Sequence, residues 1–301
     1  LDQFRLDGVR ISIAAFTNIS RDHLDYHGTM DAYRNAKARL FTELLQGAGT
    51  AVLNADEAFS EYLLAGRNID SLSYGWAGND VALRDCQAHG QGQRLKLNLM
   101  GSAAEIDFPL IGDFQVMNAL CALAMVIAGG ADADAALQGL ESLEPVAGRM
   151  QLAARLRHGA AVYVDYAHTP DALQRLLTAL RPHTKGALSI VFGCGGDRDR
   201  GKRPEMGAIA ARLADRGIVT DDNPRTEDPA DIRGAILAAV PSATEIADRA
   251  EAIVAAIKGL RAGDILVVAG KGHEKGQVIG TEIRPFNDVH VVRDALRKVS
   301  S

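Results

Sequence analysis

The segment Asp222–Arg225, with the sequence Asp-Asn-Pro-Arg, holds three side chains that together suit an amino acid ligand. A carboxylate and an amide oxygen can accept from an ammonium group, and a guanidinium binds a carboxylate in a bidentate manner. The same segment could instead lead into a helix capped by Thr226 or Asp228, and the two interpretations are compatible. Glu274, in a separate glycine-rich segment, offers a second partner for an ammonium group.

The segment Gly196–Arg203 comes close to the P-loop of nucleotide-binding proteins. Two glycines enclose four residues and a lysine follows, but Arg203 stands where a P-loop has the Ser or Thr that binds Mg²⁺. Four cationic side chains in so short a segment favour a carboxylate or phosphate ligand. We interpret it as an anion-binding loop, with a plain turn between a strand and a helix as the alternative. The four cations are Arg198, Arg200, Lys202 and Arg203.

Lys37 places a cation on the apolar face of a predicted helix, Asp31–Leu45. Tyr33 precedes it by one turn, and Leu40 and Phe41 follow it by one turn. The ordinary explanation is that the alkyl stem packs on the protein while the ammonium group reaches water. The alternative is a buried lysine that loses its charge or becomes modified, which would make it a functional residue.

His23 and His27 lie four positions apart beside Asp22 and Asp25, a cluster that could bind a metal. The spacing resembles the His-Glu-x-x-His motif of zinc proteases. Leu24 occupies the position of the catalytic glutamate, which argues against that class. Histidines hydrogen-bonded within a loop are the simpler alternative.

The elements that must position these residues alternate regularly in the second half of the chain. Apolar segments typical of strands are separated by helical segments of about ten residues. This alternation predicts a parallel sheet with helices on both faces, whose ligands bind beyond the carboxyl ends of the strands. The predicted strands are Ala161–Tyr166, Leu188–Phe192, Gly217–Thr220 and Ile265–Ala269, and the loops at their carboxyl ends are Asp165–Pro170, Gly193–Arg203, Asp221–Arg225 and Gly270–Glu274.

The first half is less regular. A turn-rich segment, Glu144–Gly148, predicts a boundary between two domains, residues 1–147 and 148–301. Short alternating segments over residues 68–108 predict antiparallel strands. The other predicted elements are strands at Ile11–Phe16 and Thr50–Leu53 and helices at Asp31–Leu45, Val116–Ile127 and Ala133–Leu140.

Composition excludes several classes of protein. The 301 residues are 47% hydrophobic and 24% charged, which is typical of a folded protein of two domains and not of a disordered chain. A net charge of −5 gives no basic field for nucleic acid, and no apolar run reaches the ~20 residues of a membrane span. Three separate cysteines without a CxxC pair predict a reducing compartment, the cytoplasm. The start at Leu1 predicts that the chain is a piece of a longer protein.

A series of motifs in order along the chain resembles the Mur ligases of peptidoglycan synthesis, especially the diaminopimelate-adding members. The resemblance implies an α/β fold in which a partial central ATPase domain, residues 1–147, precedes a Rossmann-like C-terminal domain, residues 148–301. The second domain would have a mainly parallel sheet and bind the amino acid. The motifs are Phe16–Gly28, Gly148–Met150, Asp165–Pro170, Gly193–Pro204, Asp221–Arg225 and Gly270–Glu274.

The same resemblance implies a role for individual residues. Lys37 would be carbamylated and would hold Mg²⁺ together with His23, while His168 would lie near the phosphates of ATP. These three are the expected catalytic residues. Asn118, Arg149 and Asp165 are the expected nucleotide contacts. The expected contacts to diaminopimelate are Arg198, Asp222, Asn223, Arg225, Gly270 and Glu274.

The implied reaction joins meso-diaminopimelate to UDP-N-acetylmuramoyl-L-alanyl-D-glutamate. ATP phosphorylates the side-chain carboxylate of the D-glutamate, and the incoming amine attacks the acyl phosphate to give an amide, ADP and phosphate. Mg²⁺ and cationic side chains would offset the charge on the transferring phosphoryl group. Arg225 would hold the distal carboxylate that lysine lacks, so the sequence favours diaminopimelate over lysine.

The chain also departs from the family pattern. Its members carry a P-loop with Lys and Thr, a metal-binding Glu after it and an N-terminal domain for the UDP-sugar, and the sequence is expected to begin downstream of these. We therefore expect a monomeric chain without ATP turnover of its own and with at most weak binding of diaminopimelate. The alternatives are a lysine-adding or folylpolyglutamate-type ligase of the same fold, and a non-catalytic module that binds an amino acid or peptide.

Overall fold

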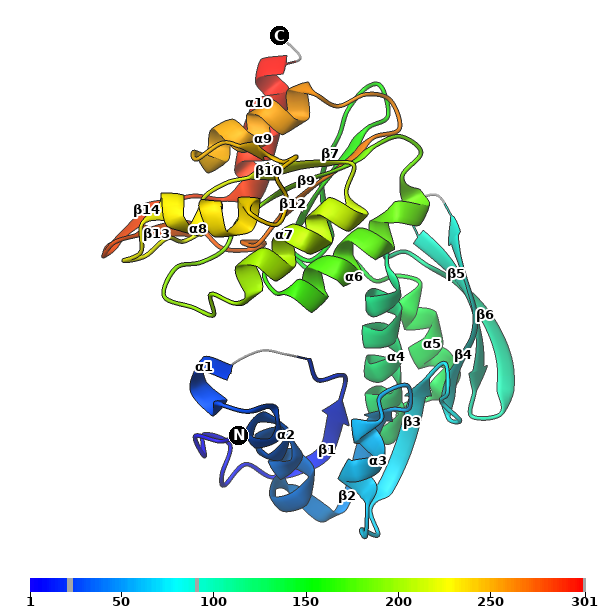
Figure 1. Cartoon of the computed structure of the whole chain (residues 1–301). Coiled ribbons are helices and arrows are strands. Elements are labelled where there is room, and N and C mark those ends of the chain that lie inside the picture. The colour runs from blue at the N-terminus through cyan, green and yellow to red at the C-terminus, as the bar shows by residue number, and fades with distance from the viewer. Residues whose placement is uncertain (21–23, 90–91, 300–301) are drawn as a thin grey trace. The chain divides into compact units, whose positions relative to one another are not determined.

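Each half of the chain is organised around a six-stranded sheet (Figure 1). The computed structural model describes residues 1–20, 24–89 and 92–299. The chain divides into two units, Leu1–Glu144 and Pro145–Ser301, at the start of the turn-rich segment noted in the sequence. Within the described part of the chain, no helix is both long and apolar enough to cross a membrane. The predicted α/β class is confirmed.

In the first unit the sheet has the strand order β1-β2-β3-β4-β5-β6, parallel from β1 to β4 and antiparallel from β4 to β6. The prediction of antiparallel strands over residues 68–108 is therefore wrong for β3. Only the end of β3 pairs with the start of β4, so the chain steps sideways without reversing direction. The strands are β1 (Ile11–Phe16), β2 (Leu45–Asn54), β3 (Asp70–Gly75), β4 (Val81–His89), β5 (Gly92–Leu99) and β6 (Ser102–Phe108).

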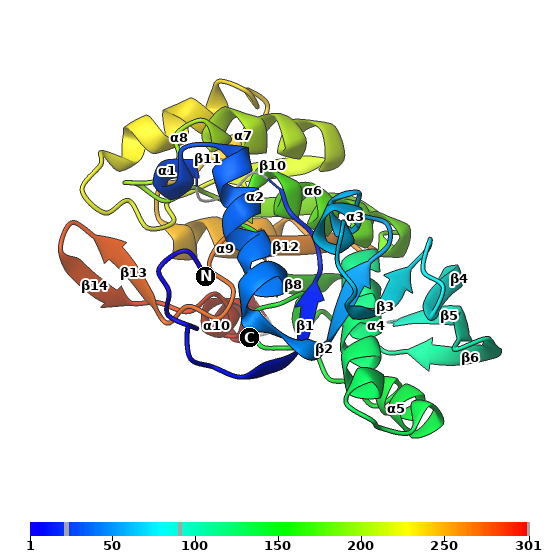
Figure 2. The same ribbon diagram turned by 90° about the horizontal axis from the view of Figure 1, so that it is seen from below.

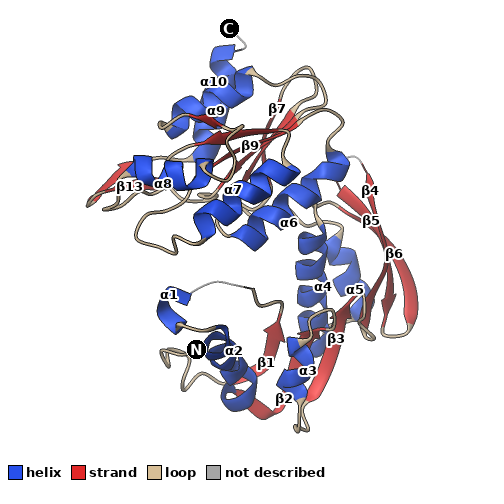
Figure 3. Ribbon diagram, in the orientation of Figure 1, coloured by secondary structure: helices blue, strands red, loops and turns tan. Residues whose placement is uncertain are grey.

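Two apolar clusters cover the opposite faces of this sheet. Successive side chains of a strand point to opposite faces, so Val52 joins the cluster around α4, whereas Ala51 and Leu53 join the cluster that contains Phe41. Figure 3 shows the helices of this unit beside the sheet. They are α1 (Leu24–His27), α2 (Met30–Arg39), α3 (Phe59–Leu64), α4 (Asp113–Ala128) and α5 (Ala133–Leu140).

Helix α2 is the element that carries Lys37. The Thr29 hydroxyl caps it by accepting from the Ala32 amide at 3.2 Å. The helix is shorter than the predicted Asp31–Leu45, because a π-helical turn, η1 (Leu40–Leu44), follows it and leads directly into β2. That strand begins earlier than predicted, since Leu45 already pairs with Ile11 of β1.

The second unit has the strand order β11-β10-β9-β12-β8-β7, in which all strands except the edge strand β7 run parallel. Every residue of β8, β9 and β12 is buried, as expected of strands covered on both faces. Strand β7 was not predicted, because its short sequence Gln-Leu-Ala-Ala-Arg carries little strand preference. The strands are β7 (Gln151–Arg155), β8 (Ala161–Asp165), β9 (Leu188–Phe192), β10 (Arg216–Val219), β11 (Thr244–Glu245) and β12 (Ile265–Ala269).

Helices cover both faces of this second sheet, as Figure 2 shows from below. Helices α9 and α10 bury Ile253, Ile257 and Val292 on one face, and α6, α7 and α8 lie on the other. A two-stranded hairpin extends from the carboxyl end of the sheet. The remaining elements are α6 (Pro170–Leu180), the 3₁₀ turn η2 (Arg181–His183), α7 (Lys202–Leu213), α8 (Pro229–Leu237), α9 (Arg249–Lys258), β13 (Gly276–Ile279), β14 (Glu282–Pro285) and α10 (Asp288–Val299).

Candidate functional site

The four loops predicted to bind ligand meet at the carboxyl ends of β8, β9, β10 and β12. The Gly196 amide donates to the Asn223 carbonyl at 2.9 Å and joins the loops after β9 and β10. The Gly270 amide donates to the Asp165 carbonyl at 3.1 Å and joins those after β12 and β8. Since all four strands are parallel, their carboxyl ends lie along one edge of the sheet.

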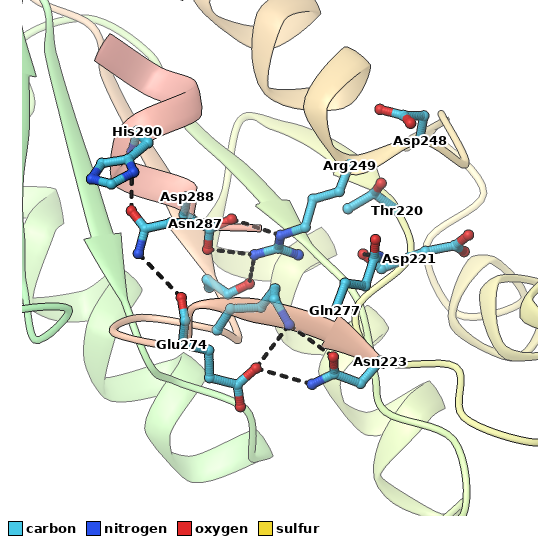
Figure 4. A network of polar contacts seen from close by, with 12 residues as sticks. Thr220, Asp221, Asn223, Asp248, Arg249, Glu274, Gln277, Asn287, Asp288 and His290 are labelled. Carbon is cyan, nitrogen blue, oxygen red and sulfur yellow. Dashed lines mark hydrogen bonds and ion pairs between the residues drawn. The ribbon is translucent and has the colours of Figure 1, made fainter. Parts of the chain in front are cut away.

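A buried lysine, Lys271, connects two of these loops through Asn223 and Glu274, which are labelled in Figure 4. Lys271 donates from Nζ to Asn223 Oδ1 and to Glu274 Oε2, both at 2.8 Å. The Asn223 amide in turn donates to Glu274 Oε2 at 3.0 Å. Burial opposes ionisation of Glu274, but the hydrogen bonds from Lys271 and Asn223 outweigh it and lower the pKa of this carboxyl. Lys271 was not among the residues predicted to bind a ligand.

Asp222 is a buried carboxylate that accepts no hydrogen bond from the described residues. It lies against Gly270, where an added Cβ would come within 2.5 Å of Asp222 Oδ2. Gly270 also has a φ of +116°, which side chains rarely adopt, so both space and conformation require glycine there. An unpaired carboxylate in this position suits an ammonium group.

Arg225 is held in an unusual conformation by the loop after β9 and by the hairpin. Its φ is +53°, its guanidinium donates to the Gly196 carbonyl at 2.7 Å, and its amide donates to the Val278 carbonyl at 3.1 Å. Such strain persists only where surrounding contacts impose it, and it is concentrated at functional sites. The helix start predicted after this segment is also present, since Asp228 caps α8.

Three of the four cations in the Gly196–Arg203 loop are engaged within the protein. Buried Arg203 lies 2.9 Å from Glu227, exposed Arg200 lies 3.2 Å from the same carboxylate, and Lys202 donates to the His168 carbonyl. The interpretation of the whole segment as an anion-binding loop is therefore too broad. Arg198 is exposed and donates only to the Asp197 carbonyl among the described residues, which leaves it available for an anion.

Replacing Glu227 by glutamine is expected to lower the free energy of unfolding at pH 7 by about 1–3 kcal/mol, because buried Arg203 loses its charged partner. The hydrogen bond from Arg203, followed by that from the Asp197 amide, lowers the pKa of Glu227 in the folded state. The stabilisation is therefore present above the pKa of about 4.3 in the unfolded chain and is lost as the pH falls through the lower folded value.

Urea unfolding of wild type and E227Q at pH 7 and near pH ~3.5 measures this effect. The difference between the two proteins should shrink at the lower pH. Glu144→Gln, at an exposed residue outside any element, is the control and should change little at either pH. A difference of equal size at both pH values would contradict the role of the Glu227 carboxylate.

Two of the predicted nucleotide contacts, Arg149 and Asp165, come together with the predicted catalytic residue His168 at the carboxyl end of β8. Asp165 accepts from the Met150 amide at 2.6 Å and from the Ala167 amide at 2.8 Å. Burial raises its pKa despite these hydrogen bonds. The Arg149 guanidinium lies 4.6 Å from the centre of the Tyr166 ring, which also contacts the His168 ring. Tyr166 was not singled out in the sequence, and its contacts make it part of this cluster.

The remaining predicted residues belong to the first unit. Lys37 is half-buried with Nζ 5.4 Å from the centre of the Tyr33 ring, and it lines a pocket of about 470 Å³ together with His27. Asn118 is exposed near the start of α4. His23 lies outside the described residues.

The described residues do not by themselves fit a Mg²⁺ ion. They contain no group of three His, Cys, Asp or Glu side chains placed to hold a metal. A lysine ammonium carries only hydrogen-bond donors, so an unmodified Lys37 is not a metal ligand. His27, the other histidine of the predicted cluster, contacts the rings of Tyr26 and Tyr33 instead.

The sequence matches two protein-family models and a series of curated proteins. Residues 1–126 match the profile described as Mur ligase middle domain, and residues 148–272 match that described as Mur ligase, glutamate ligase domain. The UDP-N-acetylmuramoyl-L-alanyl-D-glutamate--2,6-diaminopimelate ligase of Caulobacter vibrioides is 52% identical in an alignment of 306 positions, which covers all of this chain and 63% of that protein. The ligase of the same name from Zymomonas mobilis is 50% identical, covering 98% of this chain and 62% of that protein.

Solved structures give a similar result. A structure of a UDP-N-acetylmuramoyl-L-alanyl-D-glutamate--2,6-diaminopimelate ligase has a TM-score of 0.65 and 39% identity, covering all of this chain and 63% of that one. The folylpolyglutamate synthase of Mycobacterium tuberculosis, at 21% identity, has a TM-score of 0.73 over 97% of this chain and 64% of its own, which shows a shared fold. The chain thus spans about three fifths of the length of the curated relatives it matches.

Proposed function

The chain belongs to the Mur ligase family, and on that premise we propose that it takes part in the ATP-dependent addition of meso-diaminopimelate to UDP-N-acetylmuramoyl-L-alanyl-D-glutamate. The names and the roughly 50% identity of its relatives support this activity. The observation that carries the proposal is the unpaired, buried carboxylate of Asp222, which shares its loop with Arg225 and lies in the loop next to that of Arg198. Such a set matches the ammonium and carboxylate groups of an amino acid.

In this proposal the second unit binds and orients diaminopimelate. Asp222 binds an ammonium group, and Arg225 binds the carboxylate at the end of the molecule that does not react. Holding that end fixed delivers the amine at the other end to the acyl phosphate, which converts a bimolecular encounter into a positioned one. Arg198, Asn223, Gly270 and Glu274 complete the proposed contacts to the amino acid.

We propose that Arg149, Asp165, His168 and Asn118 are contacts to ATP. The stacked pair of Arg149 and Tyr166 offers a flat surface with a positive charge, which suits a nucleotide. Asp165 accepts hydrogen bonds from two backbone amides, which holds two segments of the chain in place. We propose that its carboxylate also binds a ribose hydroxyl.

We also propose that Lys37 is carbamylated and that Mg²⁺ binds to this carbamate and to His23. Carbamylation joins the neutral lysine amine to CO₂ with loss of a proton, and it replaces a cation by a carboxylate-like group of the kind Mg²⁺ prefers. The ion would offset charge on the transferring phosphoryl group. Lys37 lines a pocket of about 470 Å³, which leaves room at its amine for the added carboxyl group.

Incubating the protein with ¹³C-labelled bicarbonate tests the modification. The wild-type chain is expected to show a carbamate carbon resonance that is absent from K37R, because a guanidinium is too weak a nucleophile to add CO₂. The variant K275R, at an exposed lysine, should keep the resonance. A wild-type spectrum identical to that of K37R would contradict carbamylation of Lys37.

The activity is tested by joining this chain to the part of the C. vibrioides ligase that lies outside the match, a protein that we term the joined enzyme. With ATP, Mg²⁺ and UDP-N-acetylmuramoyl-L-alanyl-D-glutamate, the joined enzyme is expected to form product and ADP with meso-diaminopimelate. If the joined enzyme instead uses lysine or glutamate efficiently, the proposed substrate is wrong and the chain belongs to a ligase for that amino acid. Binding of diaminopimelate with no product would favour a binding module.

We further propose that the protein acts as a monomer in the cytoplasm. The net charge of −5, the three free cysteines and the lack of any membrane-crossing helix among the described residues are compatible with this. Light scattering coupled to gel filtration measures the mass of the particle, and a dimer would contradict the first part of the proposal.

A further inference from the structure

We propose that Lys271 is a positioning residue of the amino-acid site, which fixes the orientation of the Asn223 amide and neutralises Glu274 without touching the ligand. The identity of the ligand rests on the proposed function. The hydrogen-bonded group of Lys271, Asn223 and Glu274 is termed the lysine triad below.

The ammonium group of Lys271 is buried and is bound by protein groups instead of water. Its side chain is 0% exposed, whereas that of Glu274 is 30% exposed. Burying an ammonium group is costly unless it is paired and hydrogen-bonded. The two acceptors at 2.8 Å supply that pairing, and the Glu274 amide donates to the Lys271 carbonyl at 2.9 Å in the turn that brings the two side chains together.

Lys271 allows only one orientation of the Asn223 amide. The Asn223 Oδ1 atom accepts from Lys271 Nζ at 2.8 Å and from the Val278 amide at 2.9 Å. A lysine ammonium and a backbone amide are both donors only, so a flipped amide would place donors against donors. The Asn223 Nδ2 atom must therefore face Glu274, which it does at 3.0 Å.

Lys271 also determines which carboxylate carries the negative charge of the site. One oxygen of Glu274, Oε2, accepts from both Lys271 and Asn223, so the charges of Lys271 and Glu274 offset each other. Asp222 is buried and accepts no hydrogen bond from the described residues. The lysine triad therefore leaves Asp222 as the principal site for an ammonium group. Glu274 Oε1 is a second acceptor, but the charge of its carboxylate is already offset by Lys271.

The first test compares K271M with K275M in the joined enzyme. Methionine keeps much of the length of lysine but removes the charge, and Lys275 is the exposed lysine of the same segment. K271M is expected to raise the KM for diaminopimelate roughly 10- to 100-fold, while the KM for ATP stays within about twofold and K275M changes neither. A parallel rise in both KM values in K271M would mean that the lysine only maintains the fold and would overturn the proposal.

A double-mutant cycle checks the mechanism. If Lys271 acts by neutralising Glu274, then K271M/E274Q should have a lower KM for diaminopimelate than K271M, because the double variant no longer contains a partly buried carboxylate that has lost its counter-charge. Additive increases from the two substitutions would contradict the coupling of these residues.

A spectroscopic test does not depend on the proposed activity. In the ¹⁵N-labelled 301-residue chain, K271M should shift or broaden the side-chain amide resonances of Asn223, and K275M should not. Unchanged Asn223 resonances in K271M would overturn the proposal even if KM rises. If the wild-type joined enzyme forms no product with diaminopimelate, the proposed function fails, and these resonances still decide whether Lys271 positions Asn223.

Discussion

Replacing Asp288 by asparagine is expected to destabilise the second unit by about 3–5 kcal/mol, because the buried charge of Arg249 loses the carboxylate to which it is hydrogen-bonded. Both side chains of this pair are 0% exposed. Arg249 donates to the two carboxylate oxygens of Asp288 at 2.8 and 2.9 Å and to the Ala269 carbonyl at 2.9 Å. Its Nη1 atom already has no hydrogen-bond partner among the described residues, so no spare acceptor there can compensate for the loss. Urea unfolding measures the change.

Two further variants test whether the loss of stability in D288N comes from the buried charge that has lost its carboxylate. The double variant R249M/D288L should recover much of the lost stability, since apolar side chains of similar size often replace buried ion pairs without cost. Glu282→Gln, which removes the exposed partner of Arg284, should change stability by less than about 1 kcal/mol. Equal effects of D288N and E282Q would show that the buried pair contributes no more than a surface pair.

Replacing Arg225 by alanine is expected to lower kcat/KM for diaminopimelate in the joined enzyme by roughly 10²- to 10³-fold, the effect of removing one partner of a desolvated charge pair. Its guanidinium is held by the Gly196 carbonyl at 2.7 Å and so keeps its remaining donors in a fixed direction. Lysine lacks the distal carboxylate that Arg225 would bind, so the same variant should lose most of its preference for diaminopimelate over lysine.

Steady-state kinetics with both amino acids measure the Arg225 effect. Arg284→Ala, at an exposed arginine of the hairpin strand β14, is the matched control and should leave both activities unchanged. If R225A lowers the use of diaminopimelate and lysine by the same factor, Arg225 maintains the loop and does not select the ligand.

The second unit could be predicted closely from the sequence because its strands are continuous apolar segments. β9 and β12 occupy the predicted residues, and the rule that ligands bind at the carboxyl ends of parallel strands selected four loops that do meet. The first unit was harder. The direction of β3 depends on how its last two residues pair with β4, a tertiary contact without a local signal.

The chemistry within the loops could be predicted only in part. A run of cations has the same sequence signature whether it faces a ligand or a protein carboxylate. Glu227, which engages Arg200 and Arg203, comes from the next loop along the sheet. Lys271 had the opposite difficulty, since nothing in the local sequence distinguishes a fully buried lysine from an exposed one such as Lys275.

The hairpin of β13 and β14 gives the amino-acid site a reporter that can be observed in the absence of any reaction. Its Val278 amide donates to the Asn223 side chain, its Val278 carbonyl accepts from Arg225, and its Gly280 amide donates to the Arg225 carbonyl. Local opening of the hairpin would break all three contacts at once. Protection of the Val278 amide against hydrogen exchange therefore measures how often the site is disassembled, and a ligand that binds only the assembled site must slow that exchange in proportion to its occupancy.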